Sequence, residues 1–406
     1  EILTRDWSSD VCSSDLMTSN SIFSMHIPTR ILFGCGEIKK LATEKMPGKK
    51  ALIVISAGTS MRKYGYLGNV ERYLKENGVE SVVFDKVLPN PIKQHVMEAA
   101  QLCRDEKCDM VVGLGGGSSI DSAKAIAVMA CNEGDYWDYI TSGSGKGKPV
   151  TRALPIIAIP TTAGTGTEAD PWTVVTNEEL QEKIGYGCDL TYPTLSIIDP
   201  ELMVSIPPHL TAYQGFDAFF HASEGFIANC ATPISDLFAL EAIRLLYKYL
   251  PVAVKDGRNL KARAKVAWAS TLAGMVESTS SCISEHSLEH AMSAYYPQLP
   301  HGAGLIALSE AYFETFRNDC MKRYMKMADV MLGIKSNRPS DFIDALVRMQ
   351  KECGVYGIKL SDWGLKEEDL PKMVQNARHT MGGLFTLDPR PLTDEEVLGI
   401  YQKSYK

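Results

Sequence analysis

The chain contains 406 residues, of which 45% are hydrophobic and 22% are charged, with a formal net charge of −7. This length predicts roughly two or three domains. The chain has no run of about 18 apolar residues, which argues against a membrane-spanning helix. Its negative charge argues against nucleic acid as the main partner. Ten cysteines are scattered without a Cys-x-x-Cys pair, which is a poor zinc-finger pattern and predicts reduced thiols in the cytoplasm.

The first sixteen residues differ from the rest of the chain. They are rich in Ser and Asp and lack the apolar core and small-residue cleavage site of a signal peptide. The segment Arg5 to Leu16 resembles translated sequencing-adapter sequence. We therefore expect residues 1–16 to be an artefact or a disordered tail, and Met17 to be the natural start.

From Ile27 to about Pro200, short apolar strand-like runs alternate with amphipathic helical ones. The predicted helices include one ending near Lys75 and one over His95–Cys103. Such alternation is typical of a doubly wound, Rossmann-like parallel sheet, which binds ligands beyond the carboxyl ends of its strands. The predicted strands are Lys50–Ile55, Ser81–Phe84, Asp109–Leu114, Leu154–Ile159 and Leu195–Ile198.

After Pro208 the pattern changes to long segments with a 3.6-residue period, such as 234–254 and 260–276. This periodicity predicts an all-helical second domain. The proline-bounded segment 199–208 marks the boundary, which gives an α/β domain over 17–205 and a helical domain over 206–406.

A glycine-rich turn, Gly113–Lys124, follows the third predicted strand and leads into a helix predicted from Asp121 to Met129. Glycines let the backbone approach a pyrophosphate, and the start of a helix offers free N–H groups to an anion. The pattern is not Gly-x-Gly-x-x-Gly, and a tight turn without a ligand remains an alternative. Four threonines in Pro160–Glu168 follow the next strand, so they would line the same crevice.

Five of the eight histidines lie within one hundred residues, at positions 209, 221, 286, 290 and 301. Asp217 and His221 are four residues apart, as are His286 and His290. On a helix, that spacing places each pair on one face, one turn apart. The cluster predicts a metal site, and a zinc protease, a storage site or chance stay open at this point.

Five motifs occur in an order that resembles the iron-containing alcohol dehydrogenases. The resemblance runs from about Ile22 to the end of the chain. It implies an NAD(P)-binding α/β domain and a helical metal-binding domain, in a dehydroquinate synthase-like fold, with a cleft between them. The motifs are Gly115–Lys124, Pro160–Glu168, Asp199–Leu202, Gly215–His221 and Pro300–Gly302.

The resemblance also implies roles for individual residues. The divalent-metal ligands of the family match Asp217, His221, His286 and His301. A histidine close to the nicotinamide and the substrate matches His290, to which we assign substrate positioning or proton relay. The cofactor contacts match Asn90, Gly116, Gly117, Ser118, Asp121, Thr161, Thr162, Thr165 and Lys183.

The expected function is a metal-dependent alcohol dehydrogenase or aldehyde reductase. Hydride would move between a primary alcohol or diol and NAD or NADP, with Fe²⁺ or alternatively Zn²⁺ stabilising the alkoxide. Small alcohols or aldehydes are the expected partners, with no nucleic acid and no membrane. The resemblance to this family also implies a homodimer or a higher homo-oligomer.

Two other enzyme classes stay open. A zinc polyol dehydrogenase of the glycerol dehydrogenase type shares the architecture but uses different ligands. The segment His286-Ser-Leu-Glu-His290 also matches the His-x-x-Glu-His pattern of inverzincin proteases, in which the glutamate is the general base. Replacing Glu289 with Gln is expected to abolish a protease and to cost a dehydrogenase little.

The residue after the first predicted strand bears on cofactor choice. Many relatives carry an aspartate there that holds the adenosine ribose, whereas this chain carries Ser56. A missing carboxylate removes a group that would repel a 2′-phosphate. We therefore predict weak discrimination between the two cofactors or a preference for NADP.

Overall fold

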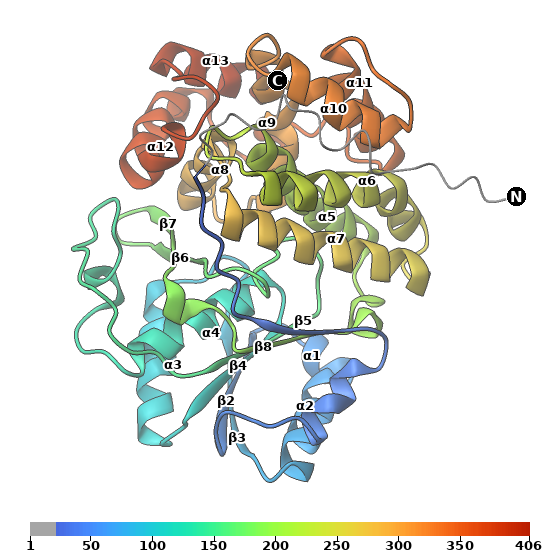
Figure 1. Ribbon diagram of the computed structural model, residues 1–406. Helices are drawn as coiled ribbons and strands as arrows, with labels where there is room; N and C mark the ends of the chain where they lie inside the picture. The colour runs from blue at the N-terminus through green and yellow to red at the C-terminus, as the bar shows by residue number, and fades with distance from the viewer. Residues whose placement is uncertain (1–21) are drawn as a thin grey trace, which may run out of the picture.

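The computed structural model describes residues 22–406, so the predicted artefact over 1–16 and the predicted start at Met17 lie outside the described residues. Strands occur only between Arg30 and Ile198, and from Pro208 onward the described chain consists of helices and loops. Figure 1 shows the sheet in the lower half of the molecule and the later helices packed above it. None of the described helices is long and apolar enough to cross a membrane.

Six parallel strands form the main sheet, and the five strands predicted from sequence are all among them. A sixth, β1, was not predicted because its four residues carry no distinctive pattern. The order across the sheet is β1 (Arg30–Phe33), β8 (Leu195–Ile198), β5 (Ile156–Pro160), β4 (Met110–Gly115), β2 (Lys50–Ser56) and β3 (Glu80–Val87).

Helices cover both faces of this sheet, as the doubly wound prediction requires. In β2, Leu52 and Val54 pack with α3 (Lys93–Asp105) and α4 (Gly117–Met129). The alternate residue Ile53 packs on the other face with α2 (Tyr66–Glu76), which follows the short α1 (Ser60–Lys63). Alternation of side chains along a strand explains this division, and Figure 1 shows the two helix pairs on opposite sides.

Two details differ from the predictions. Helix α4 begins at Gly117 rather than Asp121, so Ser118 lies in its first turn. An antiparallel hairpin of β6 (Thr173–Asn177) and β7 (Glu182–Tyr186) was also missed. Its strands are short and mix polar with apolar residues, so they lack a long periodic pattern.

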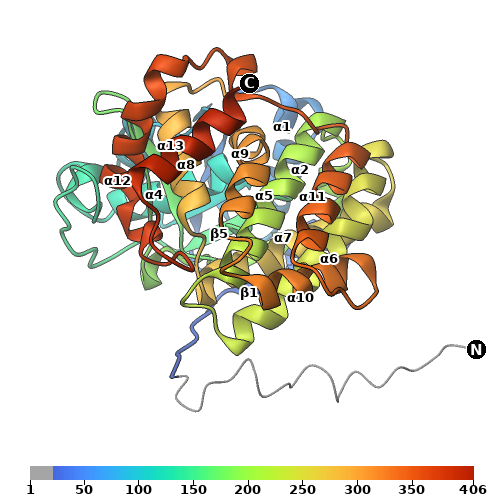
Figure 2. The ribbon, with the colours of Figure 1, turned by 90° about the horizontal axis from the view of Figure 1, so that it is seen from above.

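The helical half buries one continuous apolar core, and α5 lies at its centre (Figure 2). The predicted helices over 234–254 and 260–276 correspond to α6 and α7. The helices are α5 (Pro208–Ile227), α6 (Pro233–Lys255), α7 (Leu260–Thr279), α8 (Ser284–Tyr295), α9 (His301–Thr315), α10 (Met321–Leu332), α11 (Ser340–Glu352), α12 (Leu370–Phe385) and α13 (Asp394–Tyr405). Short 3₁₀ helices occupy Glu37–Ala42, Tyr136–Asp138, Asp189–Thr191, Pro200–Met203, Leu360–Trp363 and Glu367–Asp369.

The loop after β5 joins the two halves. Gly166 lies in the left-handed region, with φ of +67°, and packs against Gly274 of α7. A Cβ atom on Gly166 would lie 2.4 Å from the backbone nitrogen of Gly274, a distance that real Cβ atoms do not adopt. This close approach holds the carboxyl end of the sheet against the helices that carry the histidines.

Candidate metal centre and cofactor cleft

A cavity of about 270 Å³ lies between the carboxyl end of the sheet and the helical half. One wall comes from the loops after β3, β4 and β5 and from the β6–β7 hairpin. The other comes from α5, α7, α8, α9, α12 and the segment between α7 and α8. The cavity therefore brings together the two regions that the sequence identified as separate candidate sites.

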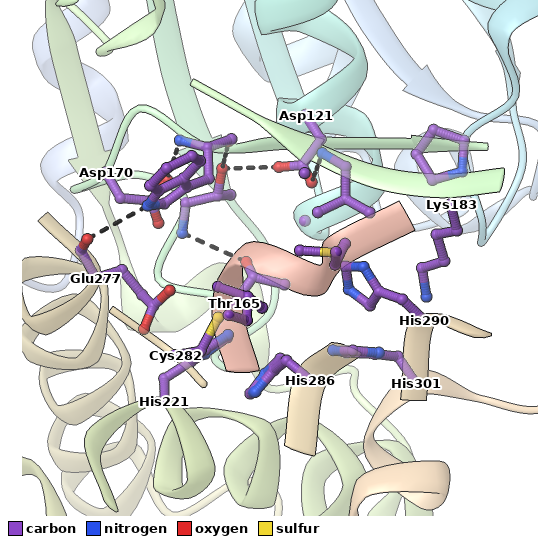
Figure 3. A pocket seen from close by; sticks show the side chains of 18 of the residues that line it. Asp121, Thr165, Asp170, Lys183, His221, Glu277, Cys282, His286, His290 and His301 are labelled. Atoms are coloured by element: carbon purple, nitrogen blue, oxygen red, sulfur yellow. Dashed lines mark hydrogen bonds between the residues drawn. The ribbon is translucent and has the colours of Figure 1, made fainter. Parts of the chain in front are cut away.

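Four predicted metal ligands converge beside this cavity. Asp217 and His221 lie one turn apart on α5, His286 lies on α8, and His301 is the first residue of α9. From Oδ1 of Asp217, the nearest imidazole nitrogens are 3.4 Å away in His301, 3.6 Å in His286 and 3.8 Å in His221. Figure 3 shows the three histidines side by side.

These atoms suit a divalent cation. Among the described residues, Oδ1 of Asp217, Nδ1 of His221 and Nε2 of His286 are buried and lack hydrogen-bond partners. Donor atoms placed about 2.1 Å from one ion in a tetrahedron lie about 3.4 Å apart, close to the distances observed. Burial lowers the pKa of His221 to about 3, so its ring is neutral and has a lone pair available for a metal.

The carboxylate of Asp217 is ionised even though it is buried. Burial opposes its ionisation, but the neighbouring imidazoles of His221, His301 and His286 outweigh that effect and hold its pKa well below the usual range. One carboxylate and three imidazoles are hard and borderline ligands of the kind that bind Fe²⁺ or Zn²⁺.

Two glutamates that the sequence analysis did not assign to the site support these ligands. Nδ1 of His286 contacts Oε1 of Glu224 from α5, and Nδ1 of His301 contacts Oε2 of Glu289 from α8. Both carboxylates are fully buried. Such contacts fix the ring orientation and tautomer of a ligating histidine and make it a better donor.

Glu289 has further partners, which changes what its substitution should do. Its carboxylate also contacts Nζ of Lys183 at 3.2 Å and the hydroxyl of Ser293. The expectation that Glu289→Gln would cost a dehydrogenase little was based on an idle glutamate in a His-x-x-Glu-His pattern. The structure contradicts that premise, because this glutamate connects His301, a predicted metal ligand, to a lysine on the cavity wall.

His290 adjoins the four-residue cluster through His301, because ligand atoms of His290, His301 and Glu289 lie within 4.8 Å of one another. It lines the cavity, its ring centroid is 5.4 Å from that of His301, and its Nδ1 has no partner among the described residues. Burial, followed by the charges of Lys183 and His301, lowers its pKa well below the usual range. A neutral imidazole facing the cavity can accept a hydrogen bond from a substrate.

The glycine turn and the threonine loop lie side by side at the ends of β4 and β5. A Cβ atom on Gly117 would lie 2.4 Å from Cγ2 of Thr165, and one on Gly116 would lie 3.3 Å from Thr162. The amide of Thr161 donates to the carbonyl of Gly115 at 2.7 Å. Only glycine fits at position 117, and α4 starts there with N–H groups that have no partner within the helix.

The predicted cofactor residues occupy different places. The wall of the cavity includes Gly117, Thr165, Asn90, Ser118, Asp121 and Lys183, whereas Gly116, Thr161 and Thr162 lie outside its lining. The carboxylate of Asp121 accepts from the hydroxyl of Thr167 at 2.7 Å and from the amide of Val174 at 3.0 Å. This carboxylate therefore ties the start of α4 to the threonine loop and the hairpin.

Two models of known protein families match most of the chain. Residues 28–200 match the model of the iron-containing alcohol dehydrogenases, and residues 211–405 match the model of the C-terminal part of that family. The first match ends at residue 200 and the second begins at residue 211.

Individual relatives agree with this assignment. The chain is 34% identical to 1,3-propanediol dehydrogenase of Klebsiella pneumoniae, over 95% of this chain and 100% of the relative. It is 41% identical to choline dehydrogenase of Bacillus subtilis, over 70% of each chain. The crystal structure of ADH/D1, an archaeal alcohol dehydrogenase from a Red Sea brine pool, is 35% identical and superimposes with a TM-score of 0.90, over 94% of this chain and 99% of the other. The protease alternative is therefore discarded, and the chain belongs to the iron-containing alcohol dehydrogenase family as a metal-dependent alcohol dehydrogenase.

Proposed function

We propose that this protein transfers a hydride between a primary alcohol or diol and NAD or NADP, with Fe²⁺ or alternatively Zn²⁺ at the Asp217 cluster. One observation carries the proposal: a single cavity is lined both by the glycine turn that starts α4 and by three of the four clustered ligands. A hydride donor and its acceptor must lie close together, and this cavity joins the residues proposed to hold each of them.

The residues around the cavity have different proposed roles, which depend on where they lie. A bound divalent cation would supply Lewis acidity to an alcohol oxygen, and a bound nicotinamide would supply the hydride acceptor. The start of α4 and Thr165 offer backbone and hydroxyl donors to a pyrophosphate. His290 is neutral and can orient a substrate hydroxyl or accept its proton.

The names of further relatives support the nicotinamide cofactor and the alcohol class. They include an NAD-dependent methanol dehydrogenase of Bacillus methanolicus and an NADH-dependent butanol dehydrogenase of Clostridium acetobutylicum. The glycerol dehydrogenase-like alternative is disfavoured because the residues here offer a complete set of one carboxylate and three imidazoles, with Glu224 and Glu289 behind two of them.

The direct test is spectrophotometric. Protein purified anaerobically and loaded with Fe²⁺ or Zn²⁺ should produce absorbance at 340 nm from NAD or NADP with 1-butanol or 1,3-propanediol, and consume it with the aldehydes. No turnover with any alcohol or aldehyde, at verified metal occupancy, would overturn the proposal.

Ser56 leads to a separate prediction on cofactor choice. It ends β2, which neighbours β4 in the sheet and therefore lies beside the glycine turn. We expect kcat/KM for NADP to equal or exceed that for NAD, and Ser56→Asp to lower the NADP value about tenfold or more while changing the NAD value little, because a carboxylate repels the 2′-phosphate. A strong NAD preference of the unmodified enzyme would contradict this prediction.

We also propose that the protein acts in the cytoplasm as a homodimer or a higher homo-oligomer. The nine described cysteines are all free, which supports a reducing compartment. Light scattering on the purified protein tests the assembly.

A further inference from the structure

A buried carboxyl group in the cavity is used by none of the steps above. Glu277 lies near the end of α7, and its side chain is 6% exposed. Its Oε1 is buried and has no hydrogen-bond partner among the described residues. Figure 3 shows that its carboxyl group points away from α7, towards Cys282 and the His221 side of the cavity.

No side chain of the described cavity wall neutralises Glu277. Lys183 lines the cavity, but its ammonium group contacts Glu289 and Ser293. Among the other acidic groups of the wall, Asp170 already has a cationic partner, because Nζ of Lys124 lies 3.1 Å from its carboxylate. Glu277 has no such partner.

The electrostatic surroundings of Glu277 disfavour its ionised form. Burial raises its pKa to about 8; His286 opposes this rise, and the carboxylates of Asp170 and Glu224 add to it. The neighbouring Cys282 is no counter-ion, since burial and Glu277 raise the pKa of its thiol well above the usual range and keep it neutral. At neutral pH this carboxyl group is therefore mostly protonated, and a cation supplied by a ligand would favour its ionised form.

An aromatic side chain of the cavity wall is bonded to the backbone of Glu277. Trp172 lines the same cavity, and its Nε1 donates to the backbone carbonyl of Glu277 at 3.3 Å. This bond attaches the indole to the end of α7 that carries the carboxyl group. Indole is the aromatic group that attracts organic cations most strongly, and its rigid attachment suits that use.

We propose that Glu277 and Trp172 form a cation subsite, and that the preferred substrate is a short alcohol carrying an ammonium or quaternary ammonium group. This inference rests on the proposed alcohol dehydrogenase function and names the substrate class of the same cavity. The reaction removes a hydride from the hydroxyl-bearing carbon to NAD(P)⁺ and a proton from the hydroxyl oxygen, so the alcohol becomes an aldehyde and the ammonium group is unchanged.

The test compares choline with 3,3-dimethyl-1-butanol, its neutral counterpart of nearly the same shape. In the metal-loaded enzyme, kcat/KM for choline should exceed that for the neutral alcohol by tenfold or more. In Glu277→Gln, the ratio should fall to near one, through a loss on choline, while the value for the neutral alcohol stays within about threefold. Trp172→Leu should lower the ratio in the same direction by a smaller factor.

Glu182→Gln is the matched control. Glu182 is a buried glutamate that bonds Trp137 and Ser144 and lies outside the cavity lining, so its substitution should leave the choline ratio unchanged. A ratio at or below one in the unmodified enzyme, or an equal loss on both alcohols in Glu277→Gln, would overturn the cation subsite. Turnover of 1-butanol distinguishes a failure of the subsite from a failure of the proposed function. If the enzyme does not oxidise 1-butanol, the proposed function is wrong. If it oxidises 1-butanol but shows either of these results, only the cation subsite is wrong.

Discussion

Asp217→Asn is expected to empty the metal centre and to lower kcat/KM by roughly a thousandfold, since several kcal/mol of Lewis-acid stabilisation correspond to about that factor. Oδ1 of Asp217 lies within 3.8 Å of nitrogen atoms from all three histidines, so it is the one atom common to the cluster. An amide keeps the shape but removes the only negative charge that faces the cation. Metal content after anaerobic loading, measured by mass spectrometry, should fall well below one ion per chain.

The control for this prediction is Asp236→Asn. Asp236 is a buried aspartate on α6 that pairs with Arg323 at 2.7 Å, and it has no contact with the cluster. Its substitution should leave metal content at one ion per chain. If Asp217→Asn bound as much iron or zinc as the unmodified protein, these four residues would not be the metal ligands.

The clustering of those four residues could be predicted because their signals are local or belong to family motifs, and their role as metal ligands stays a prediction. The pairs Asp217–His221 and His286–His290 have helical spacing, and His301 lies in the motif Pro300–Gly302. The spacing does not separate His286 from His290. The structure distinguishes them because Nε2 of His286 lies 3.6 Å from Oδ1 of Asp217, whereas His290 is grouped with Glu289 and His301.

In the fold, too, the elements with a local sequence pattern could be predicted, and those that depend on distant contacts could not. Apolar runs predicted five strands of the sheet, because both faces of these parallel strands are buried. The β6–β7 hairpin, which contains Lys183, shows no such apolar run. Its residues have their partners in α4 and the helical half, which are distant in sequence. Asp121, for example, holds the amide of Val174 in β6 across more than fifty residues of chain.

The residues that tune the site were missed for a related reason. Glu224 and Glu289 contact histidines on other helices, and Glu277 is conspicuous only because its Oε1 lacks a hydrogen-bond partner among the described residues. Sequence spacing gives neither a contact between helices nor the absence of one. Glu289 did stand out in the sequence, but only as part of a protease pattern.

Glu289→Gln is expected to weaken metal binding by about 10- to 100-fold, the range typical of residues that support a ligating histidine. The carboxylate accepts from Nδ1 of His301, which leaves Nε2 of that ring facing Asp217. Burial opposes its ionisation, yet His301 and Lys183 outweigh that effect and lower the pKa of Glu289, so the group is charged. A glutamine retains an acceptor for His301 but loses the charge that holds Lys183.

Glu289→Ala should therefore cost more than Glu289→Gln, because it removes the acceptor as well as the charge. The rate at which a chelator strips the metal from each variant measures this order directly, and the absorption spectrum of the Co²⁺-substituted protein reports whether the His301 ligand has moved. Glu224→Gln, which changes the equivalent partner of His286, provides the comparison. A Glu289→Ala protein that held its metal as long as the unmodified enzyme, with the same Co²⁺ spectrum, would show that Glu289 only fills space.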